Sequence, residues 1–560
     1  MRAIQSLSLS LTALILTACG GGSGGSATVT PPPVATAAPA PVSTTASTTI
    51  AAASEVTIGG KITFDNVPHR TQGLGLDYGA ITQEPARGVV VSLIDSTGGV
   101  IAEDITNDSG DYDFTVSASR DVRVQVAAQL KAPQGRDWDV TVTDNTAGNA
   151  LYMLEGSLSS SGTNASQTRN LNAPSGWGGA SYDSVRAAAP FAILNSVYAA
   201  IKVVDEVDAS ATFPELEIRW SPNNRPIIGE RSIGHIGTTG FFRDDNVIYV
   251  LGEEGRDTDE YDPHVIVHEW GHYFEENLSR LDSMAGLHSL SAKLDPRLAF
   301  SEGWSNAFAA IVTEDPDYKD SSGIGQNSGL KINFETLDRS NKGWFNEASV
   351  TSIIYDVFDS ASDEQDNVSA GFAPIYRALT NDAFRQSDAF ATIFSFSESL
   401  LNNSSVSPSD YRQLLTTQSI SASNALGSGE SNNGTIASAL PVYKIAEIGG
   451  AGVNVCSVDD AGSFNRLGNR ELVVFDIAQS GTYSVSTSVV TGGEDRDPDF
   501  NLWQNGEITL RAETAARGQE IYRGSLSAGR YVAEVYDFFN INGNSDRRGD
   551  GCFEFLVTAG

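Results

Sequence analysis

Hydrophobic and polar residues alternate in two stretches of this chain, one near each end. The first runs from about residue 56 to 155 and includes GVVVSLIDSTGGVIAEDITNDSGDYDFTVS, where a Gly-Gly pair and the run from Asn107 to Gly110 mark turns. The second begins near residue 445 and includes RELVVFDIAQSGTYSVSTS and GSLSAGRYVAEVYD. A period of two broken by turn residues is typical of β-strands, so the pattern predicts two small all-β sandwich domains, at 56–155 and 445–560.

Between these stretches, in residues 175–440, apolar residues recur with the period of an α-helix. In residues 191–207, side chains such as Val197, Ile201 and Val204 fall on one stripe. Further helices are predicted at 299–312, 347–360 and 408–418, and strands at 216–220 and 246–252. The mixture predicts an α+β domain, so the 560-residue chain is expected to be multidomain, with this domain between the two sandwiches.

The N-terminal residues have the pattern of an export signal followed by a tether. Residues 1–18 form a signal with an apolar run too short to remain as a membrane-spanning helix. Leu16-Thr17-Ala18-Cys19 resembles a bacterial lipobox, which implies cleavage before Cys19 and lipid on its sulfur; the alternative is an ordinary signal with a chance cysteine. Residues 19–55, rich in Gly, Ser, Thr and Pro, predict a flexible tether. We expect an exported bacterial lipoprotein, held by its lipid at the outer membrane or cell surface.

Charge and cysteine content restrict the partners and the compartment. The formal net charge of −34 argues against nucleic acid as a partner, and the acidic residues are spread along the whole chain rather than gathered in one tail. Besides Cys19, the chain has Cys456 and Cys552, which bracket the C-terminal β block. An exported protein with one remaining cysteine pair is expected to form a disulfide between them.

The segment VIVHEWGHYFEE carries the candidate chemistry. Asp262 is expected to cap its helix, with Pro263 in the first turn. His268 and His272 are four residues apart and therefore face the same way, as two imidazole ligands of Zn²⁺ require. Glu269 lies beside them, where it can act on water next to the metal. A chance occurrence of the motif is the alternative.

A third ligand is predicted thirty residues beyond His272, in AFSEGWSNAFAAIV. Glu302 stands on a helix face that is otherwise apolar, where an isolated carboxylate is costly unless it is paired or bound to a metal. Two histidines and a glutamate leave one position open for water, as in hydrolytic zinc sites.

These motifs resemble the thermolysin-like gluzincins, and SEGWSN is similar to the fungalysin form of the second motif. The resemblance implies a zincin-type catalytic domain, zinc on His268, His272 and Glu302, and Glu269 as the catalytic base. It also implies that Thr239, Gly240 and Phe241 line the cleft and pair with an extended peptide. The flanking blocks resemble a transthyretin-like sandwich and the prepeptidase C-terminal domain.

The chain departs from the family pattern in its supporting residues. Asn306 stands where the family has an aspartate that orients a zinc histidine, and its amide oxygen can still accept the imidazole N–H. The family histidine that stabilises the oxyanion is absent from FNEASVTSIIYDVF. His288 and Tyr355 are the candidates for that role. A surface histidine and a core tyrosine are the structural alternatives.

The sequence therefore predicts a zinc metallopeptidase, a hydrolase that acts on protein or peptide substrates through a metal-activated water. The alternative is a zinc-binding surface lipoprotein with weak or no catalysis, which acts in adhesion or in carbohydrate or protein binding.

Overall fold

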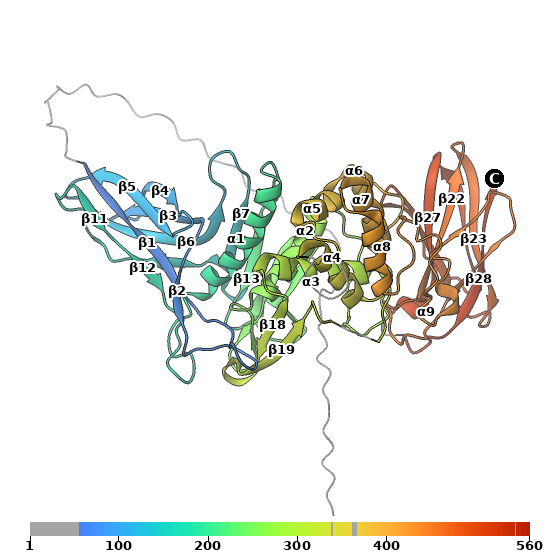
Figure 1. The fold of residues 1–560 in the computed structure, drawn as a ribbon, viewed down its shortest axis with the longest axis horizontal. Coiled ribbons are helices and arrows are strands. Elements are labelled where there is room, and N and C mark those ends of the chain that lie inside the picture. The colour runs from blue at the N-terminus through green and yellow to red at the C-terminus, as the bar shows by residue number, and fades with distance from the viewer. Residues whose placement is uncertain (1–54, 338–339, 361–366, 544) are drawn as a thin grey trace, which may run out of the picture.

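The computed structural model describes residues 55–337, 340–360, 367–543 and 545–560. The signal segment, the tether and Cys19 lie outside these residues, so export and lipidation stay predictions. No helix in the described part of the chain is long and apolar enough to cross a membrane. Three regions follow one another along the long axis in Figure 1: an N-terminal β region, a central region with most of the helices, and a C-terminal β region.

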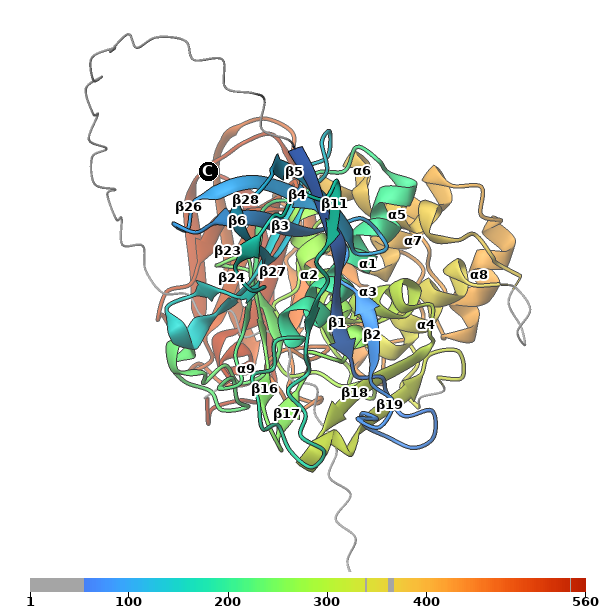
Figure 2. The same ribbon diagram turned by 90° about the vertical axis from the view of Figure 1, so that its left-hand side faces the viewer.

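The N-terminal region is built around two sheets, which lie in front of the helices in Figure 2. The long strand β1 (Glu55–Asn66) pairs antiparallel with β5 (Asp111–Ser117) and with β2 (Thr82–Pro85), and parallel with the short strands β11 (Ser166–Thr168) and β12 (Leu171–Ala173). Apolar side chains alternate along β5, where Tyr112, Phe114 and Val116 are buried and their neighbours are exposed. This alternation is the pattern that predicted strands here.

The second sheet continues into the central region. Its strands come from both sides of residues 155–175, where the sequence predicted a boundary between two domains. Its strand order is β14-β15-β13-β7-β6-β3-β4, with three short strands paired at its side. In it β7 (Asp139–Asp144) pairs parallel with β13 (Leu216–Trp220), with Val142 opposite Ile218. A parallel neighbour needs a long crossover, here containing α1, and such a connection leaves no local turn signal in the sequence. The other strands are β3 (Val89–Asp95), β4 (Val100–Ile105), β6 (Asp121–Lys131), β8 (Ala150–Leu151), β9 (Met153–Glu155), β10 (Ser159–Ser160), β14 (Gly240–Phe242) and β15 (Val247–Val250).

The central helices α1, α2, α3, α4 and α8 agree with the predicted segments to within a few residues, whereas α5, α6 and α7 were not predicted. The central helices are α1 (Ala189–Val207), α2 (Pro263–Leu278), α3 (Pro296–Thr313), α4 (Glu347–Phe358), α5 (Phe372–Thr380), α6 (Asp382–Arg385), α7 (Ile393–Asn403) and α8 (Pro408–Thr417). A small sheet of β16 (Gly252–Glu253), β17 (Asp257–Thr258), β18 (Asp317–Ser322) and β19 (Ser328–Asn333) lies beside them. Helix α2 packs on α3, and α3 packs on α4.

Two glycines permit this close helix packing. A Cβ on Gly271 of α2 would lie 3.0 Å from the Cα of Ser305 on α3, and one on Gly303 would lie 2.5 Å from the Cβ of Val350 on α4. The backbones can therefore approach closely, which brings the residues between His268 and His272 up against α3.

The predicted cap of α2 is wrong in one respect. Asp262 is the residue before the helix, but its side chain makes no capping hydrogen bond. Its Oδ2 instead accepts from the backbone N–H and the hydroxyl of Ser321 at 3.0 and 2.8 Å, and its Oδ1 lies 2.8 Å from Nε2 of His69. Tertiary partners thus compete successfully with the local cap.

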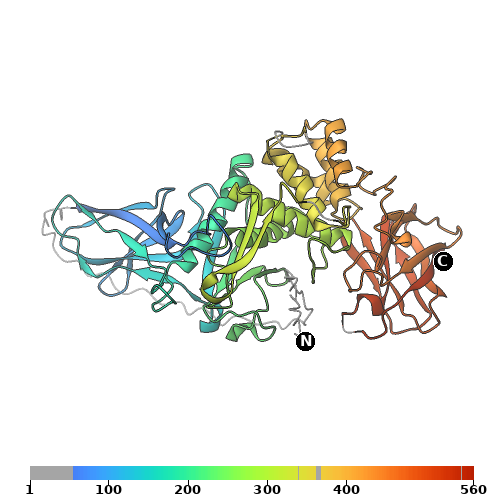
Figure 3. The same ribbon diagram turned by 60° about the horizontal axis from the view of Figure 1, so that its bottom comes forward.

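The C-terminal region is a two-sheet sandwich with its own core, which confirms the predicted β block. One sheet has the order β20-β22-β27-β24-β25 and the other β21-β28-β23-β26. Cys456 and Cys552 are register partners on β21 and β28, and they form the predicted disulfide. Figure 3 shows the sandwich beside the central helices. Its elements are β20 (Tyr443–Ile445), β21 (Val453–Ser457), β22 (Arg470–Ile477), β23 (Gly481–Thr491), β24 (Pro498–Gln504), β25 (Glu507–Ala512), β26 (Gln519–Leu526), β27 (Gly529–Asp537), α9 (Phe538–Ile541) and β28 (Gly551–Ala559).

Candidate metal centre

Helices α2 and α3 bring the three predicted metal ligands together. Nε2 of His268 lies 3.2 Å from Oε2 of Glu302, and Nε2 of His272 lies 3.4 Å from the same oxygen. All three side chains are buried, with exposed fractions of 5 %, 4 % and 1 %. One ligand atom from each lies within 4.8 Å of the others, a spacing that could hold a metal ion.

His288 joins this group from an irregular segment between α2 and α3. Its Nε2 lies 3.4 Å from Oε2 of Glu302, so three imidazole nitrogens converge on one carboxylate oxygen. Its other nitrogen, Nδ1, lies 2.7 Å from Oε2 of Glu347, the first residue of α4. At 2 % exposure His288 is not a surface histidine.

The inner atoms of the cluster lack hydrogen bonds within the described structure. Nε2 of His272, Nε2 of His288 and Oε2 of Glu302 are all buried without such a partner. Buried polar atoms are normally paired, and leaving one unpaired costs free energy. A cation between the two helices would satisfy Glu302 and His272, and an imidazole–imidazole–carboxylate donor set fits Zn²⁺.

The outer nitrogens of the two helical histidines are oriented by hydrogen bonds to side chains of α3. Nδ1 of His268 lies 3.0 Å from Oδ1 of Asn306, the position that the sequence predicts to orient a ligand. Nδ1 of His272 lies 3.1 Å from the hydroxyl oxygens of both Ser301 and Ser305. With each Nδ1 engaged in this way, each Nε2 lone pair is directed toward Glu302.

Glu275 extends this network and was not identified from the sequence. It is buried, and its Oε2 lies 3.3 Å from Nδ1 of His272 and accepts from the hydroxyl of Ser301. Its position three residues after His272 places it on the same side of α2, which is the signal that could have revealed it.

Electrostatics separate the two glutamates of the cluster. Burial raises the pKa of Glu269, against the opposing effect of the two helical histidines. Burial also disfavours the ionised form of Glu302, but the imidazoles of His288 and His272 outweigh it and hold the pKa of that carboxyl well below its usual range. Burial opposes the charge on His288 too, but Glu302 and Glu347 together raise its pKa to about 9. The two carboxyls therefore differ in the direction of their pKa shifts, and Glu269, whose pKa is raised, is the one better suited to accept a proton.

Of the predicted cleft residues, Gly240 and Phe241 lie on the edge strand β14 of the second sheet, and Thr239 directly precedes it. β14 is the terminal strand of its order, and the backbone N–H of Phe241 donates to Oε2 of Glu269 at 2.7 Å. Thr239 has a different environment: its hydroxyl donates to Asp259 and accepts from the N–H of Leu251. Gly240 is buried between them. The edge strand thus lies directly against the proposed base.

Tyr355 and His264 lie on α4 and α2, the helices that also carry Glu347 and the two helical histidines of the cluster. Tyr355 is buried on α4, where its ring packs against Phe358, and its role stays a prediction. His264 lies one turn before His268 on α2, and its Nε2 lies 3.1 Å from the carbonyl oxygen of Asp315 and 3.0 Å from the hydroxyl of Thr313, at the C-terminal end of α3.

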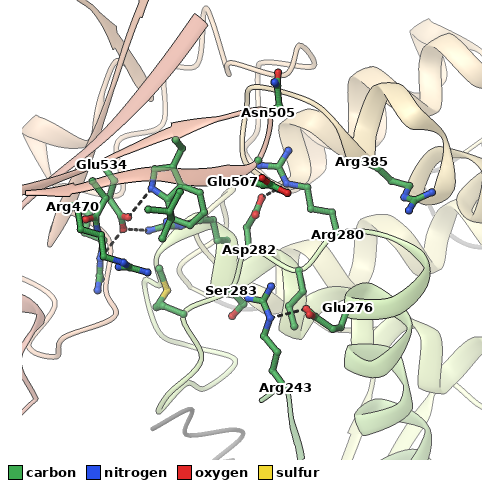
Figure 4. A pocket seen from close by; sticks show the side chains of 18 of the residues that line it. Arg243, Glu276, Arg280, Asp282, Ser283, Arg385, Arg470, Asn505, Glu507 and Glu534 are labelled. Carbon is green, nitrogen blue, oxygen red and sulfur yellow. Dashed lines mark hydrogen bonds and ion pairs between the residues drawn. The ribbon is translucent and has the colours of Figure 1, made fainter. Parts of the chain in front are cut away.

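Two other features lie near the centre. Asp257, Asp259 and Asp320 form an acidic cluster on and beside β17 and β18. A cavity of about 630 Å³ lies between the end of α2 and the sandwich, lined in part by Arg243, Arg280 and residues of β24 and β25 (Figure 4). The histidines of the centre do not line it.

Comparison with known proteins gives one family match. The family model described as Mycolysin C-terminal domain matches residues 234–419, which contain all four residues of the convergent cluster. This part of the chain is therefore related to a domain that is associated with peptidases. No curated protein matches the chain.

Several small domains are among the solved structures to which the chain is similar. The pre-peptidase C-terminal domain of a collagenase from Bacillus anthracis is 14% identical and covers 20% of this chain and 93% of its own, with a TM-score of 0.15. The periplasmic lysozyme inhibitor PliG from Aeromonas hydrophila is 17% identical over 20% of this chain and 96% of its own, with a TM-score of 0.13. A family 35 carbohydrate binding module from Clostridium thermocellum is 14% identical over 19% and 88%, also at 0.13. Such scores support no functional argument.

Proposed function

We propose that this protein is a zinc-dependent peptidase that hydrolyses peptide bonds with an activated water. The observation that carries the proposal is the convergence of His268, His272 and Glu302 on one buried point, with Glu269 beside it and hydrogen-bonded to an edge strand. The family match over residues 234–419 supports the peptidase class.

His268, His272 and Glu302 would hold the zinc, and Asn306, Ser301 and Ser305 would keep the two imidazoles in the ligating orientation. Zinc bound there supplies a Lewis acid that polarises the scissile carbonyl and lowers the pKa of water.

Glu269 performs the proton transfers. Its carboxylate takes the proton from the attacking water and later delivers it to the leaving amine, so that the C–N bond breaks as the new C–O bond is kept. Burial raises the pKa of Glu269, which makes it a better base than an exposed glutamate. The hydrogen bond from Phe241 fixes one oxygen of the carboxylate.

His288 stabilises the charge that develops on the carbonyl oxygen. Its Nδ1–H donates to Glu347, so its Nε2 points into the cluster, where the doubly protonated ring can donate a hydrogen bond to an oxyanion. Tyr355 is the second candidate for this role. The absent family histidine is thus replaced, in this proposal, by one that reaches the site from a different segment.

The substrate is a protein or peptide that adds to β14 as an extra strand. β14 is an edge strand, and Gly240 allows close approach of another backbone. Glu269 lies against the same strand, so a peptide that pairs with it passes the proton-transfer group.

Zinc content and casein hydrolysis, measured side by side on the wild type and Glu269→Gln, test the proposal. A zinc-loaded wild type that hydrolyses casein and a zinc-loaded variant that does not are the expected results. Full zinc with no hydrolysis in both would favour the alternative, a zinc-binding surface lipoprotein that acts in adhesion or in carbohydrate or protein binding.

We also propose that the protein is exported and anchored to the bacterial envelope by lipid on Cys19, at the outer membrane or cell surface. The support is the lipobox-like segment and the uncharged tether that follows it. The N-terminal residue of the mature protein tests this, since a start at any residue other than Cys19 would overturn the anchor.

A further inference from the structure

The segment that carries His288 has no regular secondary structure, although its histidine is almost fully buried. Residues 280–295 connect α2 to α3 without forming a helix or a strand. A loop of this kind cannot fix a side chain through its own backbone hydrogen bonds. The position of His288 therefore depends on what the segment touches.

One set of contacts comes from the central region. The side-chain amide of Asn346, which caps α4, donates to the carbonyl oxygens of Leu290 and Ala292 at 2.9 and 3.1 Å. These bonds hold the segment on the C-terminal side of His288.

The other set comes from the C-terminal sandwich. The loop 458–469, between β21 and β22, reaches the three residues that precede His288. Nδ2 of Asn465 donates to the carbonyl oxygens of Ala285 and Leu287 at 3.1 and 3.0 Å. Nη1 of Arg466 donates to the same carbonyl oxygen of Leu287 at 2.6 Å.

Backbone bonds continue this contact past the histidine. The N–H of Asp295 donates to the carbonyl oxygen of Asn465 at 3.0 Å, and the N–H of Leu467 donates to that of Lys293 at 3.1 Å. Asn465 is fully buried at this contact. Burial lowers the pKa of Arg466 while the charge of Glu347 opposes that shift, so the guanidinium also lies in the field of the carboxylate that pairs with His288.

The sandwich is docked firmly enough to act as a support. Nη2 of Arg297, on α3, lies 2.7 Å from Oε1 of Glu534 on β27, and both side chains are buried. Nε of Arg470 lies 3.1 Å from the same oxygen. Figure 4 shows Arg470 and Glu534 at one side of the cavity that separates the sandwich from the end of α2. Removal of one partner from a buried, shared ion pair of this kind strongly destabilises a protein, because the other charge stays buried without compensation.

We infer that loop 458–469 of the C-terminal sandwich positions His288 for catalysis, through the hydrogen bonds of Asn465 and Arg466 to the backbone of residues 285–287. The inference rests on the proposed function, because it concerns the same site. The sandwich is then a working part of the peptidase, and Asn465 and Arg466 are positioning residues that do not touch the substrate.

Arg466→Met is the primary test, since methionine keeps much of the aliphatic side chain but removes every donor. With a peptide substrate and the full zinc-loaded chain, kcat should fall about ten- to a hundredfold, as expected when a catalytic group is displaced. KM and zinc content should stay at wild-type values, because His288 acts on the transition state. Arg466→Lys, which keeps one donor group, should recover part of kcat.

Arg530→Met is the matched control. Arg530 lies on the same sandwich in an exposed ion pair with Asp476, and its replacement should leave kcat unchanged. If Arg466→Met lowers the zinc content or the Tm, Asn465→Ala replaces it as the test. This truncation removes the side-chain amide that makes the two other hydrogen bonds to residues 285–287.

A double-mutant cycle with His288→Ala separates positioning from a general loss of structure. In the His288→Ala background, Arg466→Met should cause no further loss of kcat, because the group that it positions is already gone. Additive losses would overturn the inference, as would a wild-type kcat for Arg466→Met. Failure of the proposed function has a different signature, the absence of zinc-dependent hydrolysis in the wild type, and it would reject both.

Discussion

The imidazole of His288 and the carboxylate of Glu347 lie 2.7 Å apart although 59 residues separate them in the chain. Glu347 is the first residue of α4, where the helix N-terminus stabilises a negative charge. An ionised Glu347 keeps the proton of His288 on Nδ1 or adds a second one, and in both states the ring orientation is fixed. A helix end thus determines the direction in which a loop histidine faces the metal centre.

Glu347→Gln should therefore weaken turnover without loss of zinc. The amide keeps the side-chain length and removes the charge, so we expect kcat to fall about tenfold and KM to stay unchanged. Glu215→Gln, at an exposed site before β13, is the control. Steady-state kinetics with one peptide substrate measure the effect. If kcat falls as far in Glu347→Gln as in His288→Ala, the whole contribution of the histidine depends on its orientation by Glu347.

Glu269→Gln should bind zinc as the wild type does and lose hydrolysis by about a hundredfold or more, the range for removal of a general acid–base group. The reason is that Glu269 lies beside the ligand cluster but is not part of the group whose atoms lie within 4.8 Å. Zinc determination on the dialysed protein and casein hydrolysis are the two measurements. Residual activity near the wild-type value would remove Glu269 from the mechanism.

Glu302→Ala should lose the metal itself. The variant leaves two imidazoles as the only protein ligands from α2 and α3, and it also leaves their inner nitrogens facing a cavity. We expect less than one tenth of the wild-type zinc content after dialysis. Equal stoichiometry in the variant and the wild type would show that Glu302 is not a ligand.

The core of this site could be predicted from local sequence because helices fix it. The spacing of His268 and His272 and the single carboxylate on an apolar face at Glu302 each depend on one helix period. The disulfide between Cys456 and Cys552 was predicted because these are the two cysteines that remain besides Cys19. Helix α2 begins at Pro263 as predicted, and α3, predicted at 299–312, runs from Pro296 to Thr313.

Other parts depend on contacts between distant segments and leave no local pattern. The pairing of β7 with β13 crosses a boundary that composition placed near residue 155, because a parallel neighbour can come from far along the chain. The hydrogen bonds from Asn465 to the segment before His288 span about 180 residues. An asparagine in a turn-rich loop gives no sign of such a partner, since turns favour the same residue.

The contribution of His264 to stability should fall as the pH is lowered toward 5. Burial lowers the pKa of this histidine to about 4 in the folded protein, while its Nδ1 is buried without a hydrogen bond in the described structure. Below an unfolded pKa of about 6.5 the unfolded chain binds a proton that the folded chain does not, so the free energy of unfolding decreases. The loss between pH 7 and pH 5 is about 2 kcal/mol from this residue.

Urea unfolding of the wild type and His264→Gln at both pH values measures this effect. The variant should lose less stability than the wild type between pH 7 and pH 5, and the two should run parallel between pH 8 and pH 7, where both histidine states are neutral. If the free energy of unfolding changes equally with pH in the wild type and the variant from pH 8 to pH 5, His264 is not the group responsible.

Loss of the disulfide should destabilise the sandwich first and turnover second. Cys456 and Cys552 are separated by 96 residues, and closing a loop of that length stabilises a domain by roughly 4 to 5 kcal/mol in the chain-entropy model. His268, His272 and Glu302 lie on helices outside the sandwich, so zinc content should not change on reduction. The support for His288 comes from the sandwich, so kcat should fall over the temperature range in which the reduced sandwich unfolds.

Calorimetry, zinc content and kcat followed together on the Cys456→Ser/Cys552→Ser protein test this order of events. Zinc loss that accompanies sandwich unfolding would contradict it, and two free thiols in the native wild type would show that the bond does not form.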